Sequence, residues 1–188
     1  MPVRPDEYDA AIRAILEDAG PDFVSTSNIF GTLLRVPVLT KDYRRFGDVL
    51  RRGELPPRDR EILVLRTAWR CGCPYEWAQH VRVSRSVGMT DEEITSVAHP
   101  SENASWSAFQ RTLVRAADEL HEDACLSEMT WSELATVYDE RQMIELLMLV
   151  GNYTLLSYVM NSVGVEPEAG SDPMPEGPFG PEPPTPGG

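Results

Sequence analysis

Apolar residues recur along the sequence at intervals of three and four positions, in stretches separated by glycine and proline. Near the amino terminus, Ile12, Ile15 and Leu16 share one helical face, and the stretch ends at Gly20. Further along, Pro74 stands where its missing N–H fits the first turn of a helix. Sustained two-residue alternation with hairpin turn residues does not occur. The pattern therefore predicts an all-α fold.

Local start and stop signals set the expected helix boundaries. Two capping boxes mark helix starts, one pairing Thr90 with Glu93 and the other pairing Thr130 with Glu133. The last helix is expected to end at Gly164. The expected helices cover residues 8–19, 28–36, 38–52, 56–70, 74–88, 94–99, 105–125, 134–138 and 140–163.

The composition divides the chain into a domain and a tail. Its 188 residues suit one domain with its own hydrophobic core. Residues 166–188 hold eight of the sixteen prolines, five acidic residues and no basic residue. Such a segment buries too little apolar surface to offset the entropy of ordering it. We expect a helical domain over residues 1–165 and a Pro/Gly-rich acidic tail, disordered or extended, over residues 166–188.

Charge and cysteine content narrow the surroundings in which the protein works. The formal net charge of −13 disfavours nonspecific binding to nucleic acid or an anionic membrane. Residues 144–165 are apolar, but Glu145, Gly151 and Asn152 interrupt them, which indicates a buried or interface helix. This helix is apolar over most of its circumference, so we expect a homo-oligomer. Three cysteines and no visible secretory signal favour the reducing cytoplasm.

Residues 54–94 contain the candidate chemistry. Glu76 and His80 are four positions apart, so they are neighbours on one helix face, where apolar valines flank them. On the preceding helix Glu61 shares a stripe with Leu65. A buried acid is costly unless it is paired, and its pKa and that of a nearby histidine shift. Two carboxylates and an imidazole facing the interior indicate a proton-transfer site.

Each of these features also has a purely structural interpretation. A Glu–His pair spaced by four is commonly a surface contact. Cys73 stands at a helix N-terminus that would favour its thiolate, but such cysteines are often structural. Trp77 fits a core or interface position, and the arginines near Arg58 and Arg66 fit a solvated face that could also bind an anion. No metal-binding motif is present in the sequence, so no metal site is expected.

Residues 55–94 resemble the carboxymuconolactone decarboxylase family, the wider group that includes alkylhydroperoxidase D. The resemblance lies in RDRE at residues 58–61, YEWAQH at residues 75–80, Gly88 and the acidic residues 91–93. The segments at residues 28–37 and 118–121 also look like longer members of the family. The resemblance implies an all-helical, AhpD-like domain with a central helical hairpin. It also implies dimers, trimers or hexamers whose active sites lie near subunit contacts.

The peroxidase branch of the family uses a C-x-x-C pair followed by a histidine, and a glutamate precedes that pair. The matching residues here are Glu61, Cys73 and His80, but Glu76 stands where the second cysteine would be. The resemblance therefore implies that the one-turn helical dithiol of that branch cannot form. A thiol-dependent peroxidase using Cys73, with Cys125 as its resolving thiol if the fold brings it near, is the alternative.

In the decarboxylase branch, the matching histidine and glutamate are thought to manage protons on a small unsaturated lactone acid. Carried over, His80 is the general acid, Glu76 or Glu61 orients it, and Arg58, Arg66 and Trp77 are the candidate substrate-binding residues. We expect a cofactor-free lyase or isomerase acting on a small carboxylated or lactone-type substrate. A non-catalytic binding subunit on the same scaffold is the other alternative.

Overall fold

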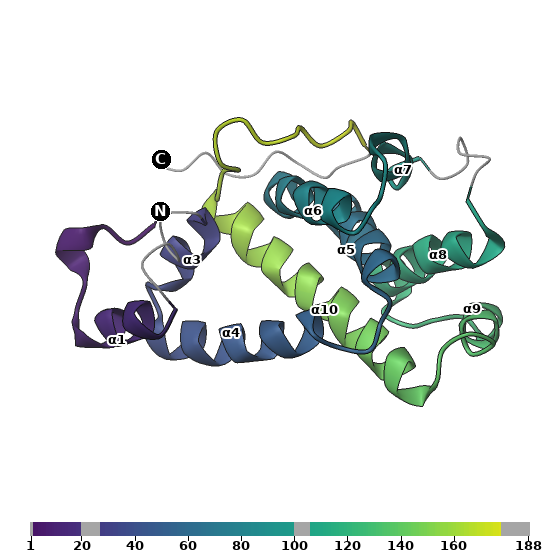
Figure 1. The fold of residues 1–188 in the computed structure, drawn as a ribbon, viewed down its shortest axis with the longest axis horizontal. Helices are drawn as coiled ribbons and strands as arrows, with labels where there is room; N and C mark the ends of the chain where they lie inside the picture. Colours follow the sequence, from purple (N-terminus) through teal and green to yellow (C-terminus); the bar gives the residue numbers. More distant parts are fainter. Residues whose placement is uncertain (1, 20–26, 100–105, 178–188) are drawn as a thin grey trace.

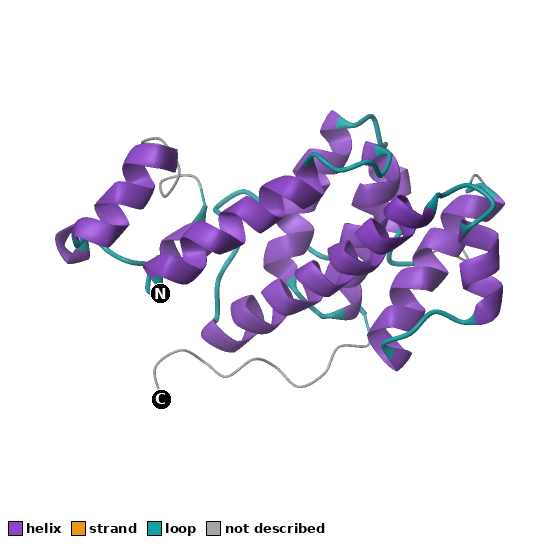
Figure 2. Cartoon of the chain, turned by 90° about the horizontal axis from the view of Figure 1, so that it is seen from below, coloured by secondary structure: helices purple, strands orange, loops and turns teal. Residues whose placement is uncertain are grey.

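A computed structural model describes residues 2–19, 27–99 and 106–177. Within them the chain is helical and contains no strand (Figures 1 and 2). This confirms the predicted all-α class. The elements are a short 3-10 helix (Pro5–Glu7), α1 (Ala10–Ala19), α3 (Asn28–Leu33), α4 (Pro37–Arg51), α5 (Pro57–Arg70), α6 (Pro74–Ser86), α7 (Asp91–Ser96), α8 (Ala108–Asp123), α9 (Glu128–Leu134) and α10 (Glu140–Val163).

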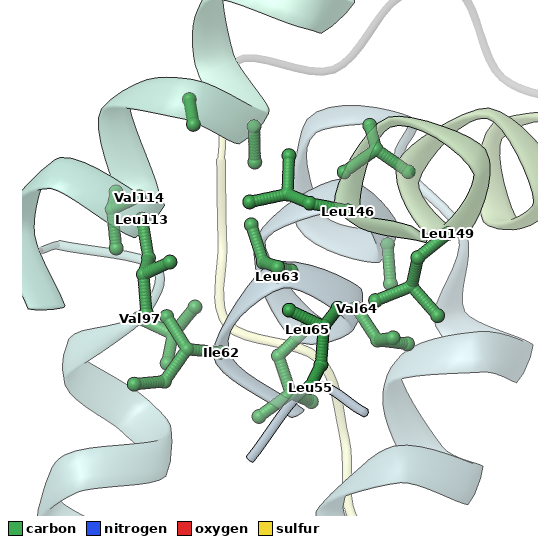
Figure 3. Close-up of a cluster of buried hydrophobic side chains, with 14 of the residues drawn as sticks. Leu55, Ile62, Leu63, Val64, Leu65, Val97, Leu113, Val114, Leu146 and Leu149 are labelled. Carbon is green, nitrogen blue, oxygen red and sulfur yellow. The ribbon is translucent and has the colours of Figure 1, made fainter. Parts of the chain in front are cut away.

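Helix α5 is the centre of the domain. Every residue from Glu61 to Trp69 is buried, because α6, α8 and α10 pack around this helix on different sides. Figure 3 shows Leu63 and Leu65 of α5 among side chains of the neighbouring helices, with Leu146 and Leu149 contributed by α10. Burying each such leucine contributes about 1.5–3 kcal/mol to folding. A polar side chain on α5 is therefore held in a dry, closely packed environment.

A short link joins α5 to α6 and forms the helical hairpin. Gly72 has a φ of +56°, a left-handed conformation that glycine adopts without strain. The backbone N–H of Cys73 then returns to the carbonyl of Ala68 at 2.9 Å. Pro74 occupies the first turn of α6, where no helical partner for an N–H is needed. The link fixes how α6 lies against α5.

Helix α10 has the predicted bounds. The carboxylate of Asp139 accepts hydrogen bonds from the backbone N–H groups of Arg141 and Gln142, and Gly164 ends the helix with a φ of +65°. Among the described helices, α10 alone is long and apolar enough to cross a membrane, and 44% of that apolar window is buried inside the domain. A core helix of a soluble fold has the same property.

One of the two predicted capping boxes is present, and the other is wrong. The Thr90 hydroxyl accepts from the N–H of Glu93, and the Glu93 carboxylate accepts from the N–H of Thr90. At α9, Ser127 is the cap instead of Thr130. Thr130 is buried, and its hydroxyl accepts from Nε of Arg115 at 2.8 Å. A tertiary contact therefore overrides the local motif. The predicted start of the preceding helix, at residue 105, lies outside the described residues.

The first half of the tail is ordered against the domain. In Figure 1 residues 166–177 run in an extended path along α6 toward α7. The carboxylate of Asp172 accepts two hydrogen bonds from Arg85, at 2.7 and 2.8 Å, and Met174 packs against the core. Residues 166–177 therefore follow an extended path held against α6 and the core. Residues 178–188 lie outside the described part.

Candidate functional site

Glu61 and His80 are paired inside the helical hairpin. Nδ1 of His80, on α6, lies 2.6 Å from Oε2 of Glu61, on α5. Glu61 is only 1% exposed, and its other oxygen lies 3.4 Å from Nε of Arg60. Because both helices are fixed by the short link between them, the hydrogen bond holds the imidazole in one orientation and leaves Nε2 facing away from α5.

Glu76 lies beside the other edge of the His80 ring. Its Oε2 is 3.6 Å from Nε2 of His80, as expected for residues four positions apart on one helix. Glu76 is 4% exposed. The three residues that the sequence pattern placed on interior-facing stripes therefore meet, with the imidazole between the two carboxylates. The ring of Tyr153, on α10, packs edge-on against His80 with the centroids 4.8 Å apart.

The site perturbs the ionisation of both groups beside its cavity. Burial raises the pKa of Glu76 to about 7, with a further increase from the charge of Glu61 and a decrease from that of His80. Burial lowers the pKa of His80, but the charge of Glu61, its hydrogen bond and the charge of Glu76 outweigh burial. The net pKa of His80 is above its usual value. Near neutrality, the site therefore holds transferable protons on both residues.

A cavity of about 590 Å³ opens beside the pair. Glu76 and His80 line it, whereas Glu61 does not and lies behind the histidine. Its apolar and aromatic walls come from four helices and include Phe30, Tyr43, Tyr75, Tyr153 and Leu156. The hydroxyl of Tyr43 donates to the side-chain oxygen of Asn152 at 2.9 Å, which joins α4 to α10 across the cavity wall. The cavity has room for a small organic molecule in contact with Nε2 of His80.

Three arginines, two in α4 and one at its C-cap, line the same cavity. They are Arg44, Arg51 and Arg52, and they share the cavity-facing side of α4 with Tyr43 and Gly47. Sequence reasoning missed them because it sought anion-binding residues near the motif. The sequence did hold one signal for them. Residues 43, 47 and 51 share one face of the predicted helix at intervals of four, and this face is not an apolar stripe of the kind that packs into a core.

The three predicted substrate-binding residues do not line this cavity. Arg66 points toward α8, where it pairs with Asp118 at 2.7 Å and donates to backbone carbonyls. Arg58 pairs with Glu93 and donates to the carbonyl of Gly88. Trp77 is 2% exposed and belongs to the main hydrophobic core. All three stabilise packing around the hairpin instead of lining the cavity.

Cys73 is buried close to the site but does not line the cavity. Its side chain is 0% exposed and packs with Ile29, Leu156 and Met160. Burial raises the pKa of the thiol to about 12, so the thiolate that a helix N-terminus would favour does not form near neutrality. The structure therefore does not give Cys73 the environment of an attacking thiol.

The geometry supports proton transfer by side chains. An imidazole held by one buried carboxylate faces a cavity beside a second carboxyl whose pKa is near neutrality, and both can exchange a proton with a bound molecule. Within residues 2–19, 27–99 and 106–177, no group of three or more His, Cys, Asp or Glu side chains is arranged to hold a metal ion.

Solved structures with the same fold include two peroxidase-related proteins and a protein of unknown function. A peroxidase-related protein with an alkylhydroperoxidase AhpD core, from Ralstonia eutropha JMP134, superposes with a TM-score of 0.72 at 20% identity over 89% of this chain and 87% of that one. One from Silicibacter sp. TM1040 gives a TM-score of 0.74 at 15% identity over 86% and 88%. A protein of unknown function from Agrobacterium tumefaciens gives 0.63 at 18% over 71% and 92%. The fold is thus that of AhpD-like proteins.

A family model matches the central segment of the sequence. Residues 37–119, which span α4 to α8 and include Glu61, Glu76 and His80, match the model of the carboxymuconolactone decarboxylase family. In this central segment the chain is similar to the carboxymuconolactone decarboxylase family, and its fold is that of the AhpD-like structures. No curated protein is significantly similar to the chain in sequence.

Proposed function

We propose that the protein is a lyase or isomerase that transfers a proton within a small carboxylated or lactone-type substrate. The observation that carries this proposal is the arrangement of His80 between Glu61 and Glu76 at the wall of the cavity. One carboxylate positions the imidazole, and the other is a carboxyl group with a pKa of about 7. Such a pair of titratable groups in different environments can act as acid and base near neutrality.

In the decarboxylation that the family name suggests, the bond between the carboxylate carbon and the substrate skeleton breaks. Its electron pair moves into the conjugated skeleton as carbon dioxide leaves, and a proton adds to a skeleton carbon. His80 supplies that proton from Nε2, and Glu76 beside it restores the proton from solvent through the cavity. Glu61 is a positioning residue, because it contacts only the far nitrogen of the ring.

The arginines on the α4 side of the cavity are the candidate binding groups for an anionic substrate, although Arg44 also pairs with Asp18 at 3.3 Å and Arg51 with Asp48 at 2.6 Å. Arg44, Arg51 and Arg52 line the cavity that His80 lines, and a guanidinium can hold a carboxylate through two parallel hydrogen bonds. A substrate carboxylate bound there would place the rest of a small molecule toward the imidazole. This role replaces the one expected of Arg58 and Arg66.

The direct test is to incubate the protein with γ-carboxymuconolactone and measure carbon dioxide release and ring isomerisation. His80→Ala is expected to lower turnover by roughly 10²- to 10⁴-fold, because a positioned general acid contributes that much. His121→Ala is the matched control, since His121 is exposed and does not line the cavity. Equal turnover in wild type and His80→Ala would refute the acid–base role. Binding of the lactone by the wild type without conversion would support the alternative that the protein is a non-catalytic binding subunit.

The alternative reaction is thiol-dependent peroxide reduction, because two proteins with the same fold are described as peroxidase-related. It requires a thiolate, whereas Cys73 is fully buried with a raised pKa. Cys125, the other thiol considered for this chemistry, is exposed and lies in the loop after α8. Peroxide consumption that Cys73→Ser abolishes would favour this alternative over the lyase.

The outer face of α10 supports self-association. Ile144, Met148, Leu155 and Tyr158 are 48–67% exposed and repeat at intervals of four, seven and three, so they form one apolar stripe along the helix. A second copy of the chain pairing its own α10 would bury this stripe. We propose a homo-oligomer formed in this way.

The three free cysteines of the chain suit the reducing cytoplasm, where we expect the protein to act.

A further inference from the structure

One residue of the cavity wall has no side chain. Gly47 lies in α4 and lines the cavity together with His80. Tyr43 lies one turn before it and Arg51 one turn after it, and both also line the cavity. On the wall formed by α4, Gly47 contributes no side chain, whereas Tyr43 and Arg44 before it and Asp48 and Arg51 after it do.

Neither the backbone nor the packing of α4 requires glycine at this position. The left-handed φ values in the described chain belong to other residues, so Gly47 has the ordinary geometry of its helix. A Cβ built on Gly47 would meet no atom within 4 Å. Glycine is the least favourable residue in a helix interior apart from proline, and alanine would fit here without a clash. Folding alone does not account for this glycine.

We propose that Gly47 determines which ligands reach His80, by leaving open the part of the cavity between Tyr43 and Arg51. This inference rests on the proposed function, because it takes the cavity as the substrate site. A side chain at position 47 would extend from α4 into the cavity. The glycine thus admits a small ring-sized skeleton beside the arginines, and larger residues at this position would narrow the substrate range in proportion to their volume.

Accessibility of His80 tests the inference without any substrate. Diethyl pyrocarbonate carbethoxylates neutral imidazoles, so the reaction is run above the raised pKa of His80, and mass spectrometry of the digested protein reports the rate at each histidine. In Gly47→Phe we expect the rate at His80 to fall by at least tenfold. The exposed His99 and His121 are expected to react as in wild type, so they serve as internal references. The control is Val49→Phe, which adds the same ring on α4 at a 68% exposed position outside the cavity.

Stability and turnover then separate a ligand role from a folding role. Gly47→Ala and Gly151→Ala both replace helix-interior glycines at which a Cβ meets nothing within 4 Å, but only Gly47 lines the cavity. We expect both variants to raise the melting temperature by about 2–4 °C, because alanine favours the helix. With γ-carboxymuconolactone, kcat/KM is expected to fall in the order wild type, Gly47→Ala, Gly47→Phe, and to be unchanged in Val49→Phe.

The outcomes distinguish this inference from the proposed function. If wild type converts the lactone but Gly47→Phe reacts with pyrocarbonate and turns over like wild type, the role of Gly47 is refuted and the proposed function stands. If wild type does not convert the lactone while the labelling of His80 falls only in Gly47→Phe, the glycine controls access to a site with another ligand. A fall in labelling of equal size in Val49→Phe would also refute the inference.

Discussion

His80 and Glu61, nineteen positions apart in the sequence, are joined by a 2.6 Å contact between Nδ1 and Oε2 across the two helices of the hairpin. The contact ties an imidazole at the cavity wall to a carboxylate that is 1% exposed. A buried carboxylate in this position favours the protonated imidazole and fixes which ring nitrogen faces the cavity. The chemistry of the site therefore depends on a residue that a ligand cannot reach.

Replacing Glu61 with glutamine should lower the pKa of His80. The variant keeps a hydrogen-bonding group next to Nδ1 but loses the negative charge that opposes the effect of burial. We expect turnover of the lactone to fall by at least about tenfold, since the proton donor is less well matched to neutral pH. The pKa is measured by NMR titration of the His80 ring. Glu122→Gln, at an exposed residue of α8, is the control. An unchanged His80 titration would contradict the positioning role.

Glu76 should make the protein less stable as the pH rises. Its pKa is about 7 in the folded chain and 4.5 ordinarily, so the folded state binds the proton more tightly between these values. The free energy of unfolding therefore falls as the pH rises from 4.5 to 7, by on the order of 3 kcal/mol. His80, whose pKa is also raised, contributes in the same direction. Urea denaturation of Glu76→Gln across this range is expected to show a flatter pH dependence; a slope equal to that of wild type would contradict the assignment.

The three cysteines should react with iodoacetamide in the order of their exposure. Cys125 is exposed, Cys71 is half-buried with a raised pKa, and Cys73 is buried with a pKa of about 12. In the folded protein we expect Cys73 to react at least about a hundredfold more slowly than Cys125, because the thiolate is the reactive form. Peptide mass spectrometry gives the three rates. Fast labelling of Cys73 would reopen the peroxidase alternative.

Removing the carboxylate of Glu168 should destabilise the domain. One of its oxygens accepts from the N–H of Asn28 and from the hydroxyl of Tyr75, both at 2.9 Å, and the other accepts from Gln79. Glu168→Ala leaves these donors without that partner, which we expect to lower the free energy of unfolding by about 2 kcal/mol. The exposed Glu176, changed to alanine, is the control for loss of a tail charge. Equal stability of the two variants would show that the tail does not anchor α3 to α6.

A charge on the outer stripe of α10 should dissociate the expected homo-oligomer. Leu155→Glu places a carboxylate in the middle of the exposed apolar face, where pairing would bury it at a high cost. Light scattering of wild type should give a multiple of 21.0 kDa, and the variant should give the monomer mass. Met129→Glu, at an exposed apolar residue of α9, is the control. A monomeric wild type would contradict the proposal.

Much of the fold could be predicted because its boundaries are set locally. The bounds of α10 follow from an aspartate cap and a terminal glycine, and the Thr90 box marks the start of α7. The convergence of Glu61, Glu76 and His80 was also predictable, since polar residues on interior stripes of two linked helices must meet in the interior. That Thr130 does not cap a helix could not be predicted, because its hydroxyl is engaged by Arg115 from another helix and Ser127 is the cap.

The anion-binding side of the site depends on contacts distant in the sequence. Nothing in the sequence near Arg66 shows that α8 will place Asp118 beside it, and nothing near Arg52 shows that α4 will border the cavity. The ordered start of the tail has the same origin. The composition of the tail predicts that it buries little apolar surface, but the carboxylate of Glu168 accepts hydrogen bonds from α3 and α6, which are remote along the chain.

The Gly72 link has a consequence for how this scaffold can diversify. Because the link holds α6 against α5, position 76 stays at the cavity wall whatever side chain it carries, and the Glu61–His80 pair does not depend on it. A single substitution at position 76 can therefore replace the proton-carrying carboxyl group with a thiol or an inert side chain while Glu61 and His80 are retained. A change at position 76 alters the group beside Nε2 of His80, whereas the contact between His80 and Glu61 involves no atom of that side chain.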